Sequence, residues 1–121
     1  MSLPLFDYGQ LSDHCPLAGL IAPLLAHPAT VQGRLFRTPS GQPTLLLGGR
    51  GEVHGRLLEG LPDRTLPLLD AVLGVHQGTA RRVEVRAVHG LRAVSAWTWI
   101  SVDARPGTLV KDGVWRGPVR R

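Results

Sequence analysis

The stretch Leu5-Phe6-Asp7-Tyr8-Gly9-Gln10-Leu11 decides how the chain begins to fold. Aromatic and apolar residues over residues 3–8 predict a short strand that ends at Gly9. A glycine after a tyrosine lets backbone N–H groups approach a ligand closely, and consecutive amides that face one point can hold an anion. We therefore expect the amides of Gly9, Gln10 and Leu11 to form a ligand-binding loop, although a plain strand-ending turn has the same pattern.

Outward from this stretch, the sequence predicts more strand than helix. Apolar residues recur at helical spacing over Leu17–Leu25 and again over Leu66–Leu73, where Gly74 would end the helix. Further strands are expected over Ala29–Arg37, Thr44–Leu47, Val53–Glu59, Ala80–Val88 and Arg92–Ile100, the last two forming a hairpin at His89-Gly90. About six strands and two short helices in mixed order favour an α+β fold with a curled sheet or barrel. At 121 residues, we expect one domain that spans residues 1–121.

The basic charge of the chain comes from scattered arginines. The net charge is +5, and Lys111 is the only lysine. This composition, rich in Arg, Ala, Gly, Leu and Pro, is typical of a GC-rich, bacterial-type genome. A basic interaction module would need Arg81, Arg82 and Arg86 to share one face with the arginines of the tail, and its binding would weaken steeply with salt. We do not expect nucleic-acid binding, because no run of five like charges occurs.

The single cysteine and the histidine spacing argue against several classes of site. Cys15 alone cannot form a disulfide within the chain or a cysteine metal cluster. None of the five histidines has the spacing of a zinc motif, so we expect no metal and no cofactor. The longest apolar stretch, Leu17–Ala26, is too short to cross a bilayer. We therefore expect a cytoplasmic protein without a membrane segment.

Further motifs follow the opening stretch in a fixed order. Ala29–Phe36 is similar to a Val-x-Gly-x-Leu-Tyr strand, and Gly51–Leu58 is similar to a Val-x-Gly-Glu-Leu-Tyr strand. Residues 68–83 resemble Leu-Asp-x-x-Glu-Gly followed by Tyr-x-Arg, Ala96–Ile100 resembles Ala-Trp-x-Tyr-Val, and Lys111–Trp115 resembles a Gly-Asp-Trp tail. In order and spacing, these motifs resemble the gamma-glutamylcyclotransferase-like superfamily over most of residues 3–100.

The resemblance implies a small mixed β-barrel with flanking short α-helices and a pocket beside the Tyr-Gly loop. In active members of the family, a gamma-glutamyl compound binds there. Its α-amino group attacks its own γ-carbonyl and releases 5-oxoproline and an amine. A glutamate of the Leu-Asp-x-x-Glu-Gly motif moves the proton. The resemblance also implies a small-molecule, possibly gamma-glutamyl-like, partner.

The chain departs from the family at the glutamate itself. Counted from Leu69-Asp70, that position is Leu73, which can neither donate nor accept a proton. The family tyrosine also falls at Thr79 or Ala80. General acid–base groups supply about 10²–10⁴ in rate, so we expect the standard reaction to be lost while a ligand pocket remains. Whether the chain is an enzyme stays open at this point.

Other side chains of the sequence could take the missing role. Asp7 is the first candidate for a displaced carboxylate, because it precedes the tyrosine at the edge of the implied pocket. Glu84 and the loop histidine His76 are weaker candidates, and a Cys15–His14 pair is weaker still.

Binding roles are expected for a second set of residues. Tyr8 would contact the ligand or pack in the core, and Arg81 or Arg82 could bind a carboxylate. Asp70 is expected to orient the turn rather than to do chemistry. Exposed strand edges and the tryptophans Trp97 and Trp99 leave a homodimer open.

Overall fold

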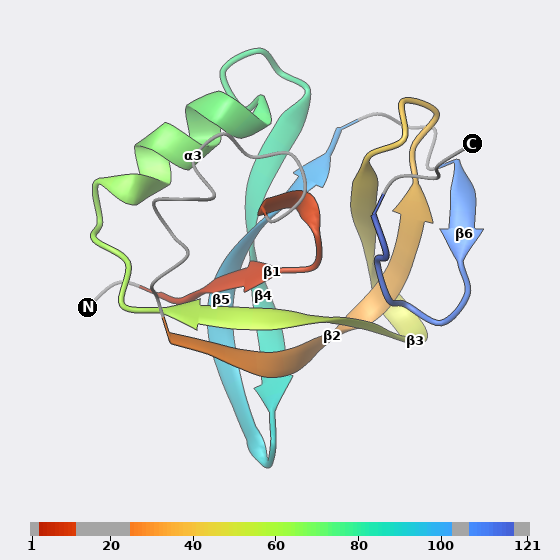
Figure 1. The fold of residues 1–121 in the computed structure, drawn as a ribbon, viewed down its shortest axis with the longest axis horizontal. Helices are drawn as coiled ribbons and strands as arrows, with labels where there is room; N and C mark the ends of the chain where they lie inside the picture. Colours follow the sequence, from red (N-terminus) through yellow and green to blue (C-terminus); the bar gives the residue numbers. More distant parts are fainter. Residues whose placement is uncertain (1–2, 12–24, 103–106, 118–121) are drawn as a thin grey trace.

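The computed structural model describes residues 3–11, 25–102 and 107–117. Five of its strands close into a mixed barrel in the order β3-β1-β5-β4-β2, and β2 pairs back with β3 (Figure 1). Neighbouring strands are antiparallel except for β1 and β5, which are parallel. A short strand, β6, adds to β2 outside the closed ring. The barrel strands are β1 (Leu5–Asp7), β2 (Leu25–Arg37), β3 (Pro43–Glu59), β4 (Ala80–His89) and β5 (Arg92–Ser101), and β6 is Thr108–Val110.

The helix α3 (Thr65–Leu73) lies over one end of the barrel (Figure 1). It ends where the sequence predicts, because Gly74 takes a left-handed conformation and donates its N–H to the Asp70 carbonyl. A mixed β-barrel with a short flanking helix confirms the predicted α+β class. No helix in the described segments is long and apolar enough to cross a membrane.

Strand alternation divides the core into two clusters, because successive side chains of a strand point to opposite faces. Within β1, Phe6 belongs to the barrel interior and Leu5 to a second cluster that α3 covers. The barrel interior also holds Tyr8, Ala29, Val31, Leu35, Leu45, Val53, Leu57, Val85, Ala87 and Ala96, whereas the second cluster holds Leu11, Leu58, Leu69 and Trp99. The short strand β1 therefore lies between two packed layers, which holds the loop that follows it.

The close approach of β1 to β3 depends on Gly55 of the second strand motif. A Cβ atom at Gly55 would lie 2.4 Å from the Asp7 carbonyl oxygen and 2.9 Å from the Phe6 ring. Real Cβ atoms do not come so close, so only glycine allows Asp7 to pair opposite Arg56 in this register. The glycine of this motif thus positions the start of the Tyr-Gly loop.

Two predicted elements differ from the structure. Residues 44–47 and 53–59 were expected as two strands joined by a flexible turn, but they form the single strand β3. The pairing with β2 is interrupted between Gln32 and Gly33 and then resumes, so the glycine-rich residues 48–51 form an irregularity within one strand. The helix expected over Leu17–Leu25 falls outside the described residues except for Leu25, which begins β2.

Candidate functional site

A cavity of about 580 Å³ opens between α3, the facing ends of β4 and β5, and the turn that joins β2 to β3. Its volume lies within the range of small-molecule pockets, about 300–1,000 Å³. Its described lining residues come from five separate segments: Tyr8, Gln10, Thr38, Ser40, Gln42, Pro43, Val72, Leu73, Gly78, Thr79, Ala80, Trp99, Ile100, Ser101 and Val102.

Positions singled out from different parts of the sequence meet around this cavity. Tyr8 and Gln10 come from the Tyr-Gly loop (residues 8–11), and Leu73 comes from the last turn of α3. Thr79 and Ala80, which stand where the family tyrosine is expected, also line it. Leu73 is half-buried and packs against the second core cluster. The cavity therefore has an apolar wall at the position where the family resemblance expects a carboxylate.

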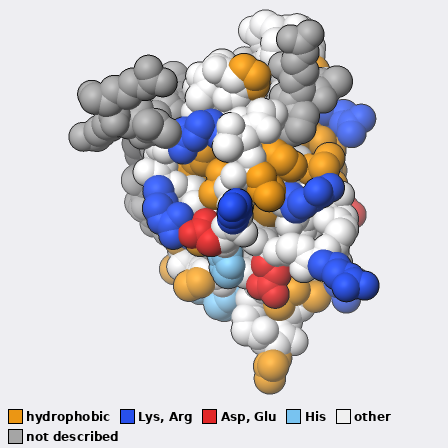
Figure 2. All heavy atoms as spheres, turned by 90° about the vertical axis from the view of Figure 1, so that its right-hand side faces the viewer, with side chains coloured by type: hydrophobic (Ala, Val, Ile, Leu, Met, Phe, Trp, Pro, Cys, Tyr) orange, Lys and Arg blue, Asp and Glu red, His pale blue; other side chains and the backbone are white. Residues whose placement is uncertain are grey.

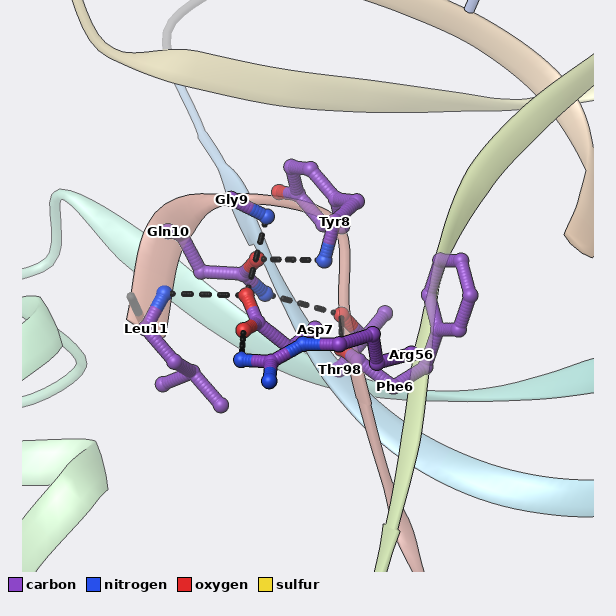
Figure 3. Close-up of polar contacts among 8 residues, drawn as sticks. All are labelled: Phe6, Asp7, Tyr8, Gly9, Gln10, Leu11, Arg56 and Thr98. Atoms are coloured by element: carbon purple, nitrogen blue, oxygen red, sulfur yellow. Dashed lines mark hydrogen bonds and ion pairs between the residues drawn. The ribbon is translucent and has the colours of Figure 1, made fainter. Parts of the chain in front are cut away.

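The Tyr-Gly loop wraps around a carboxylate that belongs to the chain itself (Figure 3). Asp7 Oδ1 accepts hydrogen bonds from the Gly9 N–H at 2.9 Å and the Leu11 N–H at 3.2 Å. The other oxygen, Oδ2, accepts from Arg56 Nη2 at 3.1 Å. The Asp7 side chain is 1% exposed and does not line the cavity. Two of the three amides expected to hold a ligand thus bind an internal anion.

A second set of hydrogen bonds fastens Gln10 to the neighbouring strand. Gln10 Oε1 accepts the Tyr8 N–H at 3.1 Å, and Gln10 Nε2 donates to Thr98 Oγ1 at 3.0 Å. The Thr98 hydroxyl in turn donates to the Phe6 carbonyl at 2.8 Å. Thr98 is not among the residues predicted from the sequence, although a threonine between two tryptophans of a buried strand is the kind of polar residue that requires a partner. These bonds hold the loop rigidly against β5.

Tyr8 lies in the core with its hydroxyl bonded to the backbone. It is 2% exposed, and its phenol donates a hydrogen bond to the Trp99 carbonyl. Burial raises the pKa of the Tyr8 phenol well above its ordinary value of 10.0, the negative charge of Asp7 raises it further, and a hydrogen bond with Thr44 partly offsets both. The phenol therefore stays protonated at neutral pH and cannot act as a general base there.

Gly9 allows the C-terminal part of the chain to cover the loop. Its φ is +133°, and a Cβ atom there would lie 2.3 Å from Cδ1 of Trp115. Trp115 also stacks with Arg37, whose guanidinium carbon lies 4.3 Å from the ring centroid. The indole therefore packs directly onto the backbone of the Tyr-Gly loop, which requires glycine at this position.

Asp70 ties α3 to the strands beneath it. Its Oδ1 accepts a hydrogen bond from Trp99 Nε1 at 2.8 Å and lies 3.6 Å from Arg82 Nε. Arg82 also lies over the Trp97 ring, 4.8 Å from its centroid. These contacts orient the helix so that Leu73 faces the cavity, and they engage Arg82 away from it.

The remaining predicted site residues lie away from the cavity. Arg81, Glu84 and His76 are exposed, and none of them lines it. Cys15 and His14 lie outside the described residues. Within the described part of the chain, no group of three His, Cys, Asp or Glu side chains could hold a metal ion.

The arginines of β4 do not form one basic face. Arg82 and Arg86 point to one side of the strand and Arg81 points to the other, because side chains alternate along it. Figure 2 shows basic side chains spread over the face that carries β6, with hydrophobic side chains between them. This distribution gives a basic interaction module no continuous surface on that face.

Several solved structures share this fold. YkqA from Bacillus subtilis has 23% identity and a TM-score of 0.72 over 95% of this chain, which spans only 40% of YkqA. An uncharacterized protein from Pyrococcus horikoshii has 19% identity and a TM-score of 0.70, with 93% of this chain and 89% of that one covered. An Arabidopsis thaliana protein has 23% identity and a TM-score of 0.69, with 95% and 70% covered.

Sequence comparison identifies the family. No curated protein matches the chain. The model of the family described as "Gamma-glutamyl cyclotransferase, AIG2-like" matches residues 5–117, which include the Tyr-Gly loop, both Val-x-Gly strands, α3 and Trp115. The chain belongs to the gamma-glutamyl cyclotransferase, AIG2-like family.

Proposed function

We propose that this protein binds a small ligand in the cavity beside the Tyr-Gly loop and does not catalyse the 5-oxoproline-forming reaction that the family resemblance implies. One observation carries the proposal. Leu73 lines the cavity where a glutamate is expected, and no Asp, Glu or His is among the described residues that line it. The cavity has the size of a ligand site but lacks an evident proton carrier.

The chemistry explains why the side chain at position 73 matters. In the implied reaction, the α-amino nitrogen forms a bond to the γ-carbonyl carbon, and the bond from that carbon to the leaving nitrogen breaks. The attacking nitrogen must lose a proton, and the leaving nitrogen must gain one. Leucine cannot carry this proton, and Tyr8 keeps its own because burial raises its pKa. The loss of one general acid–base group costs about 10²–10⁴ in rate.

A displaced catalytic Asp7 is the competing interpretation, and the hydrogen bonds around it favour the first proposal. Both Asp7 oxygens accept hydrogen bonds, from Gly9, Leu11 and Arg56. To reach a substrate in the cavity, the carboxylate would have to break these bonds, which include those to two buried amides. Such a cost, about 1–3 kcal/mol for each buried group, makes Asp7 a poor proton carrier for this cavity.

The test is an assay of 5-oxoproline release from a panel of gamma-glutamyl amino acids and amines. We expect the natural protein to be inactive and Leu73→Glu to gain activity, at least about 10² above the natural protein. Leu73→Gln is the matched control, because it has nearly the shape of glutamate but cannot transfer a proton, and it should stay inactive. Turnover by the natural protein that Asp7→Asn abolishes would overturn the proposal and assign the proton transfer to Asp7.

A further inference from the structure

The outer face of α3 is apolar, although it is exposed to solvent. Asp70 is the only charged residue of the helix, and its carboxylate accepts a hydrogen bond from Trp99 Nε1 beneath it. A helix on a protein surface ordinarily presents charged or polar side chains to solvent. On α3, the exposed residues are instead Pro67, Leu68, Ala71 and Val72. Single exposed apolar side chains are common, whereas a contiguous apolar face points to something that binds there.

This apolar face continues into the cavity through Val72. Val72 lines the cavity and is nevertheless 41% exposed, so it lies at the rim where the cavity opens. Leu68 stands four residues earlier, which places it beside Val72 on the same face of the helix. It is 51% exposed and is not among the lining residues, so it extends the apolar surface beyond the rim. The rim elsewhere is mixed, because Val102 and the hydroxyl-bearing Ser40 and Thr79 are also exposed lining residues.

From this continuity we infer that the ligand carries an aliphatic chain, which leaves the cavity past Val72 and lies along Leu68 on the outer face of α3. The inference rests on the proposed ligand-binding function and deepens it, because it names the class of ligand. The polar head of the ligand occupies the cavity, whose lining contains hydroxyl and amide side chains as well as apolar ones. The aliphatic chain covers the apolar surface that the helix presents to solvent.

The geometry of the helix sets the length of chain that this surface can hold. An α-helix rises about 1.5 Å per residue, so Val72 and Leu68 lie about 6 Å apart along its axis. With carbon–carbon bonds of about 1.5 Å, a chain of about six carbons spans this distance, whereas a methyl group ends at the rim. A fully buried methylene strengthens binding about fourfold, and a methylene on an open surface buries about half of its area. We therefore expect the affinity to rise about twofold for each methylene along α3.

The test titrates the full natural chain by calorimetry with four gamma-glutamyl amides, which carry a methyl, ethyl, butyl or hexyl group on the amide nitrogen. We expect the Kd to fall about 10–20-fold from the ethyl to the hexyl compound. Leu68→Gln should weaken binding of the hexyl compound about fourfold to eightfold, the share of two or three methylenes, and should leave the methyl compound unchanged. Glutamine keeps a high helix propensity, so the helix should persist. Leu109→Gln, the same change at an exposed leucine of β6 that does not line the cavity, should alter neither affinity.

The outcomes separate the aliphatic chain from the ligand pocket itself. An affinity that is independent of chain length, or a gain that Leu68→Gln leaves intact, would overturn the inference but keep the pocket. If no member of the series bound at millimolar concentration, the ligand-binding function would fail together with the inference. Sedimentation velocity without probes tests the other occupant: a dimer that Leu68→Gln converts to a monomer would show that a second copy covers this face, and it would overturn the inference. Release of 5-oxoproline by the natural protein would overturn the proposed loss of catalysis alone, and the same comparison of chain lengths would then be made on kcat/KM.

Discussion

Removal of the Asp7 carboxylate should destabilise the protein more than most single substitutions. Asp7→Ala removes the acceptor of two buried N–H groups, those of Gly9 and Leu11. Hydrogen bonds to a charged group contribute about 1.5–3 kcal/mol each. The ion pair with Arg56 adds at most about 1 kcal/mol, because the Arg56 side chain is 53% exposed and its charge is screened by solvent. With partial relaxation of the loop, we expect a loss of about 3–5 kcal/mol, a large part of the typical stability of about 5–15 kcal/mol.

Urea unfolding followed by circular dichroism measures this loss of unfolding free energy. In a thermal unfolding experiment, the midpoint temperature should fall by about 4 °C for each kcal/mol. Two further variants separate the contributions. Asp7→Asn keeps an oxygen for the two amides but loses the charge, so it should cost about 1–2 kcal/mol. Arg56→Gln removes only the exposed ion pair and should cost at most about 1 kcal/mol. If Asp7→Ala cost no more than Arg56→Gln, the carboxylate would not be what holds the loop, and the reasoning would be wrong.

Three further predictions follow from the core and from the covering tryptophan. Tyr8 is the only tyrosine, and the folded chain keeps its phenol protonated, whereas the unfolded chain loses that proton near pH 10. The free energy of unfolding should therefore be unaffected below about pH 10 and should fall above it by up to about 1.4 kcal/mol per pH unit. Near-ultraviolet absorbance should show phenolate only as the chain unfolds. Ionisation of the phenol near pH 10 with an unchanged fold would contradict this prediction. Gly9→Ala places a methyl group against Trp115 in a conformation with positive φ, so it should lower the free energy of unfolding by about 2–4 kcal/mol. In a double-mutant cycle, Trp115→Ala should recover the steric part of this loss. Purely additive effects would argue against the contact. Leu69→Ala should lower the free energy of unfolding by about 2–5 kcal/mol, because Leu69 is 0% exposed. Leu68→Ala, at the neighbouring position that is 51% exposed, should lower it by less than about 0.5 kcal/mol. Equal losses would place Leu69 outside the core.

The leucine at position 73 fits the packing of the fold. The barrel depends on strand glycines and on two clusters of fully buried apolar residues, and Leu73 is not among those fully buried residues. Leu73 instead extends the apolar cluster beneath α3. A leucine at this position is therefore compatible with the fold and with the cavity.

Several features of the protein follow from its sequence alone, because they depend on local periodicity and turn chemistry. The alternation in residues 80–100 predicts the β4–β5 hairpin, although its turn lies at Gly90-Leu91 rather than at the expected His89-Gly90. Helical spacing with Gly74 predicts α3 and its end. The order of the Tyr-Gly and Val-x-Gly motifs identifies the family before any distance is known, and the family match agrees with it.

The tertiary structure decided the features that depend on contacts between distant residues. Local pattern shows that a segment is a strand but not which neighbour it pairs with, so the parallel β1–β5 pairing and the continuity of β3 through its glycines could not be predicted. The same holds for Asp7. Its sequence position suggested a carboxylate available for catalysis, whereas the register of β1 against β3 brings Arg56, 49 residues away, to one of its oxygens. The turn at Gly9 brings two amides to the other oxygen, so an apparent catalytic candidate is engaged in holding the loop.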